Sequence, residues 1–450
     1  MLRGFLGQLP ERVASRLAKA IEVDRLIGGT DLPHEELLQA LRPQLRQMPD
    51  KKRMATPQRF FCRPFEDILV NGTNKTKMKG RIARSSIVPI WHWLSTDLIP
   101  DPHKKLTAEI RDAIIKDREE EIYAKLEELW NVSAAAIKSA LATDKKKADA
   151  ARKLGSAIAA EDAAEIALLL SSGTAIIVLQ SKLPRPILVL GEAEIDILRS
   201  TYDHSLETNP DLAPYIALIA MGRMARPWEA LHLASVLAHH TDDIVISKTD
   251  IGAVGELLFG DLDAYAAKIC AVRPGDFDPN ALVETLGAFA ELSSGMVKEL
   301  GIRRDGKWGQ QLTKARGAVA QIMEGLVERA PKEILAAMPS GKAGGGRGSK
   351  ILDLSRAPDP EKTARAMRYA QLIAHSRPFA VAASFNAKLS GVLEDLTISL
   401  RLFGEELLKE VRAPQPGAQL ENNLEIVFGL CALILGEEET AFLRRRARAA

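Results

Sequence analysis

Apolar residues recur at intervals of three and four along almost the whole chain, whereas the alternation of apolar and polar residues that marks a β-strand is nearly absent. Aromatic residues make up only 5% of the sequence, so its cores must be built mainly from Leu, Ile, Val and Ala, which suits closely packed helices. The N-terminal stripe illustrates the period with Leu2, Phe5, Leu6, Leu9, Val13, Leu17 and Ile21. We therefore predict an all-α protein, either a multi-helix bundle or an irregular, solenoid-like helical array.

The 450 residues are enough for several cores of ordinary size or for one extended array. We predict N-terminal helices with an irregular basic and aromatic segment over residues 1–100, and a central helical array over 101–338. A glycine-rich linker is expected at 339–350, followed by a C-terminal helical segment at 351–450. No fixed repeat period is visible, which argues against the TPR, HEAT and ankyrin families.

The sequence also gives four predictions for single helices and strands. Residues 102–130 are expected to form one strongly charged helix, and Ser86 is expected to cap a helix that runs to about Leu98. Residues 65–70 are expected to form a short strand before an Asn-Gly turn. Residues 174–190 are expected to form a buried helix broken at its two prolines, with strands as the alternative.

Positive charge is concentrated in one block. Residues 42–84 contain twelve Lys or Arg and three acidic residues, a local charge of +9 in a chain whose net charge is +2, so the remainder carries about −7. Five of the 22 aromatic residues lie within or just after this block, between Phe60 and Trp93. A basic, aromatic segment within an otherwise Ala- and Leu-rich chain predicts a binding surface for an anionic partner.

Interface hot spots favour aromatic residues and arginine, so we predict partner contacts at the aromatic and cationic positions of this segment. These are Arg59, Phe60, Phe61, Arg63, Lys77, Arg81, Trp91 and Trp93. Three partners fit the charge: a protein with an acidic surface (including the acidic helix of this chain or of a second copy), an anionic membrane surface, or nucleic acid. A sequence pI near 8.3 argues against a dedicated nucleic-acid binder. The structural alternative is that the phenylalanines hold an irregular segment against the core while the cations are solvated.

A second candidate site is a group of potential metal ligands. His232, His239, His240, Asp242 and Asp243 lie close together in the sequence, and His232 and His239 would share one face of a helix. The HExxH pattern is missing, and the alternative is that the histidines end one helix while the aspartates begin the next. We expect no bound metal or other cofactor.

Other catalytic patterns are not found. The glycine-rich run near Lys342 lacks GxxxxGK[ST] and follows a helical stretch rather than a strand, so a linker is expected there. The three cysteines are far apart and include no CxxC, which favours reduced thiols in a cytoplasmic protein, with Cys62 packed rather than reactive. The first residues do not resemble a signal peptide, and no apolar run reaches the ~20 residues that cross a bilayer.

These observations favour a non-enzymatic cytoplasmic adaptor or scaffold that binds an acidic protein partner through residues 42–93. The alternatives are an enzyme with a polar or metal site at His232, His239, Asp242 and Asp243, and a peripheral binder of anionic membrane or nucleic acid. Self-association is a further expectation.

Overall fold

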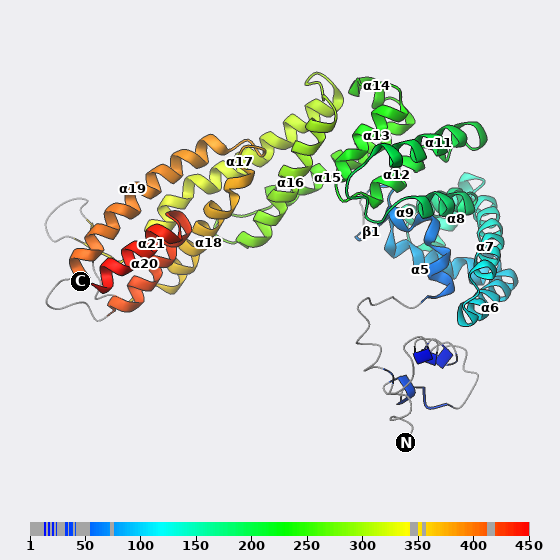
Figure 1. The fold of residues 1–450 in the computed structure, drawn as a ribbon, viewed down its shortest axis with the longest axis horizontal. Helices are drawn as coiled ribbons and strands as arrows, with labels where there is room; N and C mark the ends of the chain where they lie inside the picture. The colour runs from blue at the N-terminus through cyan, green and yellow to red at the C-terminus, as the bar shows by residue number, and fades with distance from the viewer. Residues whose placement is uncertain are drawn as a thin grey trace. The chain divides into compact units, whose positions relative to one another are not determined.

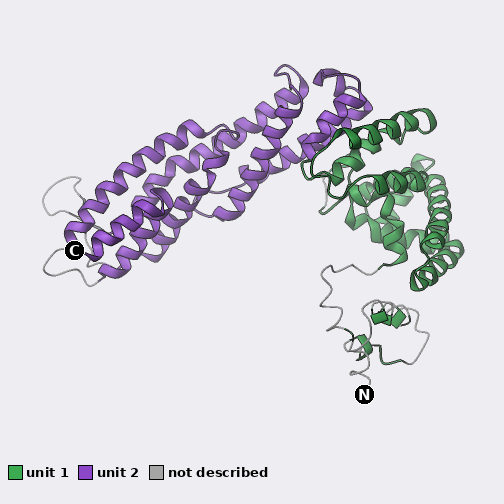
Figure 2. Ribbon diagram, viewed as in Figure 1, with its two compact units in different colours: residues 1–226 green, residues 227–450 purple. Residues whose placement is uncertain are grey.

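A computed structural model of the chain confirms the all-α class (Figure 1). It describes residues 55–72, 76–342, 350–352, 357–411 and 419–449, together with single positions between 13 and 41. The chain divides into two compact units, unit 1 from Met1 to Arg226 and unit 2 from Pro227 to Ala450 (Figure 2). The predicted boundaries at residues 100, 338 and 350 lie within these units and stay predictions.

Unit 1 is made of short and medium helices. Its first elements are α4 (Pro57–Phe61), the 3-10 helix η1 (Arg63–Ile68), β1 (Leu69–Val70), β2 (Ile82–Ala83), α5 (Arg84–Trp93) and the π-helical turn η2 (Leu94–Leu98). The following elements are α6 (Pro100–Lys116), α7 (Glu119–Ala140), α8 (Asp144–Leu154), α9 (Ala157–Leu170), α10 (Gly173–Lys182), α11 (Glu192–Thr208) and α12 (Ala213–Arg223). Most of α9 and nearly all of α12 are buried, so these two apolar helices form the centre of the unit.

Two local predictions about the helices of unit 1 are wrong. Residues 102–130 form two packed helices, α6 and α7, because Asp117 ends α6 in the left-handed conformation at a φ of 58°. A chain that turns there lets both amphipathic helices bury their apolar faces against each other. Ser86 does not cap α5, since the N-cap position is Ala83 and Ser86 lies inside the first turn.

The predicted strand at 65–70 is also mostly wrong. Residues 63–68 form η1, and only Leu69 and Val70 pair as a strand, in parallel register with Ile82 and Ala83. The Asn-Gly turn follows, with Gly72 at a φ of 105°. The prediction for 174–190 is confirmed in its helical part, because α10 ends at Lys182, before the prolines, and the chain continues without a helix as far as α11. The predicted burial is wrong for most of α10, in which Gly173, Ile176 and Leu179 are the buried residues.

Unit 2 consists mainly of long helices. Before the glycine-rich segment it contains η3 (Pro227–Glu229), α13 (Ala230–Leu237), α14 (Asp243–Ile246), η4 (Asp250–Gly252), α15 (Ala253–Cys270), α16 (Pro279–Glu299) and α17 (Lys307–Leu335). After it come α18 (Pro360–Ser376), η5 (Arg377–Phe379), α19 (Asn386–Val411), α20 (Leu420–Ile434) and α21 (Glu437–Arg448). Glycine allows two close helix contacts, since a Cβ at Gly255 would lie 2.1 Å from the Trp308 ring and one at Gly295 would lie 2.4 Å from Trp228.

The predicted linker borders a small antiparallel pair, β3 (Ser340–Lys342) and β4 (Lys350–Leu352), and its residues 343–349 lie outside the described part of the chain. Most of the predicted N-terminal helices also lie outside it. The described positions there are helical in part and include a small apolar cluster of Ala14, Ala18, Ile21 and Leu41.

No single helix in the described ranges is long and apolar enough to cross a membrane. One pair, α9 with α10, reaches the required length and composition only when the two are taken together, and it bends by 74° at the break between them.

Candidate functional site

All eight predicted partner-binding residues are buried or half-buried. Phe61 and Trp93 are 2% and 5% exposed, and neither can offer its ring to a partner. The Phe61 ring lies edge-on to Trp91 at a centroid distance of 5.1 Å, and the Trp130 indole donates a hydrogen bond of 3.1 Å to the Phe61 carbonyl. The aromatic residues of the segment therefore pack on one another, and Trp130 of α7 holds the segment through the Phe61 carbonyl.

The arginines of the segment are also engaged within unit 1. The Arg63 guanidinium lies 4.4 Å from the centroid of the Phe60 ring and donates a hydrogen bond to the Tyr123 hydroxyl on α7. Burial lowers the pKa of Arg63, and the nearby carboxylates of Glu66 and Glu119 oppose that shift. Arg59 and Arg81 are half-buried. Part of the basic block thus meets the acidic start of α7 inside the same unit.

Lys77 is held by three hydrogen bonds within unit 1. Its ammonium group donates to the Asp162 carboxylate at 2.6 Å, to the Arg81 carbonyl at 2.6 Å, and to the Glu165 carboxylate. A lysine has three N–H donors, so these contacts use all of them. Asp162 and Glu165 are one turn apart on α9, and their side chains are 1% and 5% exposed.

Both carboxylates accept further hydrogen bonds, three from residues 80–86 and one from α12. Asp162 accepts hydrogen bonds from the Ser86 hydroxyl at 2.6 Å and from the Ala83 N–H at 3.2 Å. Glu165 accepts one from the Gly80 N–H at 2.6 Å and one from the Tyr215 hydroxyl at 2.7 Å. Burial, followed by the neighbouring Glu165, raises the pKa of Tyr215. We call this group the α9 carboxylate cluster; it holds residues 77–86 to the core.

A second group of charged side chains surrounds Asp67, which is buried. Asp67 on η1 accepts a hydrogen bond of 2.9 Å from the Gln180 amide, and its oxygens lie 3.3 Å from the Arg185 guanidinium and 3.7 Å from that of Arg223. Burial raises the pKa of Asp67, against the opposing effect of the two arginines. Cys62 beside it is also buried, and burial raises the pKa of its thiol to about 12, so it is a packed thiol rather than a nucleophile.

A groove opens beside the α9 carboxylate cluster. It has a volume of about 670 Å³ and is lined by residues of the 77–79 stretch and of α8, α9 and α12. Its wall contains Leu141, Leu168 and five alanines, Ala148, Ala151, Ala157, Ala160 and Ala164. The exposed charged residues on it are Lys79, Lys147 and Glu161. Sequence reasoning missed both lysines as site residues.

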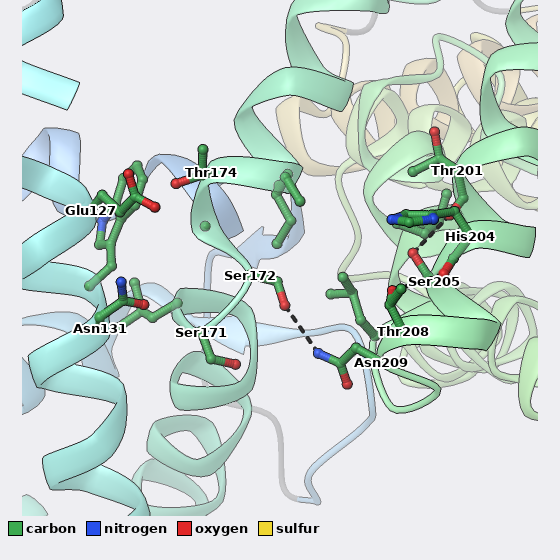
Figure 3. Close-up of a pocket in the computed structure, with 17 residues that line it drawn as sticks. Glu127, Asn131, Ser171, Ser172, Thr174, Thr201, His204, Ser205, Thr208 and Asn209 are labelled. Carbon is green, nitrogen blue, oxygen red and sulfur yellow. Dashed lines mark hydrogen bonds between the residues drawn. The ribbon is translucent and has the colours of Figure 1, made fainter. Parts of the chain in front are cut away.

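A smaller pocket of about 310 Å³ lies between α7, the start of α10 and the end of α11 (Figure 3). The Asn209 amide donates a 3.1 Å hydrogen bond to the Ser172 hydroxyl across it. Thr201, Ser205 and Thr208 each donate their hydroxyl proton to a carbonyl of their own helix, at 2.7 to 2.8 Å. Its hydroxyl groups therefore face the pocket mainly as acceptors. Among the described residues that line it, the charged or titratable side chains are Glu127 and His204, which are too few to hold a metal ion.

The five candidate metal ligands of unit 2 do not form a metal-binding group; among the described residues, no three His, Cys, Asp or Glu side chains are placed to hold an ion. The helix α13 ends at Leu237, so His239 and His240 follow it, and His239 has a φ of 51°. Asp242 caps α14 by accepting a 2.9 Å hydrogen bond from the Ile244 N–H. His232 is exposed, whereas Asp243 is buried and its pKa is raised by that burial.

Comparison of the whole chain with protein-family models, with curated proteins and with solved structures finds no match.

Proposed function

We propose that the protein is a non-enzymatic, cytoplasmic adaptor that binds an acidic, amphipathic helix of a protein partner in the groove beside the α9 carboxylate cluster. The observation that carries this proposal is the composition of the groove: an apolar wall of small side chains with exposed lysines on it. An amphipathic helix can lay its apolar face in such a groove and direct its carboxylates toward the cations.

The alanines suit a helical partner. Ala148 and Ala151 come from α8, and Ala157, Ala160 and Ala164 come from α9, so small side chains from two packed helices line the same space. Small residues let a third helix approach closely, as they do where helices pack within a protein. Ala148, Ala157 and Ala164 are exposed in the free protein and would be covered by the partner.

The charges of the groove favour an acidic partner. Lys77 offsets one of the two buried carboxylate charges, and its three donors are occupied, so the exposed lysines are the cations a partner meets. The Lys79 ammonium lies 5.5 Å from the centroid of the Tyr215 ring, and Lys147 has a weak, exposed pairing with Asp144 at 3.7 Å. Such an exposed pair contributes only ~0–1 kcal/mol, so a partner carboxylate can replace it. Glu161 is the one exposed carboxylate of the groove.

The proposal keeps the predicted type of partner but moves the contact surface. The predicted aromatic and arginine positions lie within the fold of unit 1, and of the described residues between 42 and 93 only Lys77 and Lys79 line the groove.

The test uses two designed 20-residue helical peptides, one with a Leu/Ala face and a Glu face, the other with Lys in place of Glu. We expect the full-length protein to bind the Glu peptide in fluorescence anisotropy, with affinity that falls as salt is raised. The double variant Lys79→Glu/Lys147→Glu should weaken binding about tenfold or more, the equivalent of ~1.4 kcal/mol. Lys145→Glu, on the same helix α8 but outside the groove, is the matched control.

Equal binding of both peptides, or full binding by the double variant, would contradict the proposal. Duplex DNA and vesicles with anionic lipid serve as competing probes. If either binds more tightly than the Glu peptide and the same lysine variants abolish that binding, the partner is a nucleic acid or a membrane and not an acidic helix.

A further inference from the structure

Unit 2 exposes an apolar patch on the paired helices α19 and α21. Ile398 and Leu402 on α19 are 53% and 64% exposed, and Phe442 on α21 is 52% exposed. Ile398 and Leu402 are four residues apart, so they are neighbours on the surface of α19. Isolated exposed apolar residues are ordinary, but a contiguous group of large ones indicates an interaction surface.

Two bidentate ion pairs join α19 to α21 beside this patch. Arg401 donates to both oxygens of Glu439 at 2.6 and 2.9 Å, and Arg446 donates to both oxygens of Glu405 at 2.6 and 3.0 Å. Since the sequence advances in the same direction from one pair to the next on both helices, α19 and α21 run parallel here. Between them Leu443 packs over Gly404.

Phe442 lies on the same side of the α19–α21 pair as Ile398 and Leu402. It precedes the inward-facing Leu443 and is turned about 100° from it around the helix axis. The Arg446 guanidinium, which binds Glu405, also lies 5.6 Å from the centroid of the Phe442 ring. Phe442 and the apolar residues of α19 therefore border one another across the α19–α21 seam.

The charges around the patch differ between the two helices. On α19 the apolar pair is bracketed by exposed acids, because Asp395, Ile398, Leu402 and Glu406 follow one another at intervals of three and four residues and so form one stripe. On α21 the residues after Phe442 include the exposed cations Arg445 and Arg448. An acidic helix thus lies beside a helix whose last turns are basic, with apolar side chains at the boundary.

We propose that this α19–α21 face binds the same face of a second copy of the chain. A two-fold axis parallel to the helices places α19 of one copy on α21 of the other at the same level along the axis. Leu402 then packs on Phe442 of the second copy, and Glu406 faces Arg445 of the second copy. The other face-to-face two-fold arrangement would set α19 on α19, which opposes acid to acid.

The charge pattern selects a second copy over other partners. A membrane or nucleic-acid phosphate against Phe442 would also meet Asp395 and Glu406, which repel it. The proposed pairing brings two like charges together, Glu438 of one copy and Asp395 of the second copy. They meet at the end of the patch opposite Arg445. Replacing Glu438 by lysine should therefore strengthen the association.

Sedimentation equilibrium of the full chain between about 1 and 100 μM tests the proposal. We expect a mass near twice the 49.1 kDa of the chain at the upper concentrations. Leu402→Glu and Phe442→Glu should yield the mass of one chain, whereas Val381→Glu, at a 74% exposed position outside the patch, should leave the association unchanged. Circular dichroism confirms that each variant is folded.

Charge exchange separates self-pairing from a general effect of charge. Glu406→Arg and Arg445→Glu should each raise the dissociation constant about tenfold, and the two changes in one chain should restore it, because the pair is then reversed but again complementary. Glu438→Lys should lower it. The proposal is overturned if the wild-type chain keeps the mass of one copy throughout, if Leu402→Glu still associates, or if the double exchange fails to recover association.

Discussion

Both units set a glycine against a tryptophan ring, Gly173 against Trp130 in unit 1 and Gly255 against Trp308 in unit 2, whereas buried charges hold the least regular segment of unit 1. Residues 77–81 form no helix or strand, and the Lys77 ammonium and the Gly80 N–H within them, together with the Ala83 N–H, are satisfied by two carboxylates of α9. In unit 2 the backbone is satisfied within long helices, and close apolar packing is enough. Lys77 of the basic block therefore faces inward, whereas Arg445 and Arg448 of α21 are exposed.

The largest expected effect is on the α9 carboxylate cluster. Lys77→Met removes the cation and leaves two buried carboxylates without it, so the free energy of unfolding of unit 1 should fall by about 3–5 kcal/mol. Urea unfolding followed by hydrogen exchange in α9 measures this locally. Lys79→Met, at an exposed position two residues away, should change it by less than ~0.5 kcal/mol. Equal effects of the two variants would show that Lys77 is not held by buried charge.

The corresponding change in unit 2 tests packing instead of charge. Gly255→Ala puts a Cβ about 2.1 Å from the Trp308 ring, so the ring and helix must shift, and stability should fall by about 1–3 kcal/mol. Gly317→Ala on α17 meets open space and should raise stability by up to ~1 kcal/mol through helix propensity. Thermal unfolding of the two variants gives the sign directly, and a loss in Gly317→Ala as large as in Gly255→Ala would contradict the packing explanation.

A smaller effect is expected within the α9 carboxylate cluster. Ser86→Ala removes one hydrogen bond to the buried Asp162 carboxylate, which keeps its bonds from Lys77 and Ala83. The loss should be about 1.5 kcal/mol, near the lower limit for a bond to a charged group. Ser85→Ala, at the exposed neighbouring position, is the control in the same denaturation experiment and should be nearly neutral. A neutral Ser86→Ala would mean that Asp162 does not depend on this donor.

Thiol labelling tests a property that the two units share, a buried cysteine, and involves no change in stability. Burial raises the pKa of Cys62 in unit 1 and of Cys431 in unit 2 to about 12, while Cys270 is exposed. The reactive thiolate of the two buried cysteines is therefore scarce at pH 8. One thiol per folded chain should react with Ellman's reagent, and three after denaturation. Rapid reaction of Cys62 in the folded protein would contradict the packing of the basic segment.

The sequence was sufficient for the fold class, because helical periodicity is a property of the whole chain. It was not sufficient for Asp117 or Ser86, where a single left-handed residue or a distant carboxylate decides the local structure. The partner residues were predicted from charge and aromatic content alone, which do not indicate which side of a segment faces inward. A usable signal was present in α9, where Asp162 and Glu165 lie one turn apart on an alanine- and leucine-rich face of the helix, although Glu161 beside them is exposed. Polar residues on such a face call for buried partners.

The distance along the chain between Gly80 and Glu165 sets an order of events during synthesis. These groups are 85 residues apart, and so the 77–86 segment leaves the ribosome long before the carboxylates that bind it. At ~5–20 residues per second the delay is on the order of 4–17 s. Throughout that interval Lys77 and the N–H groups of the segment are open to chaperones and proteases, and release of α9 ends this exposure.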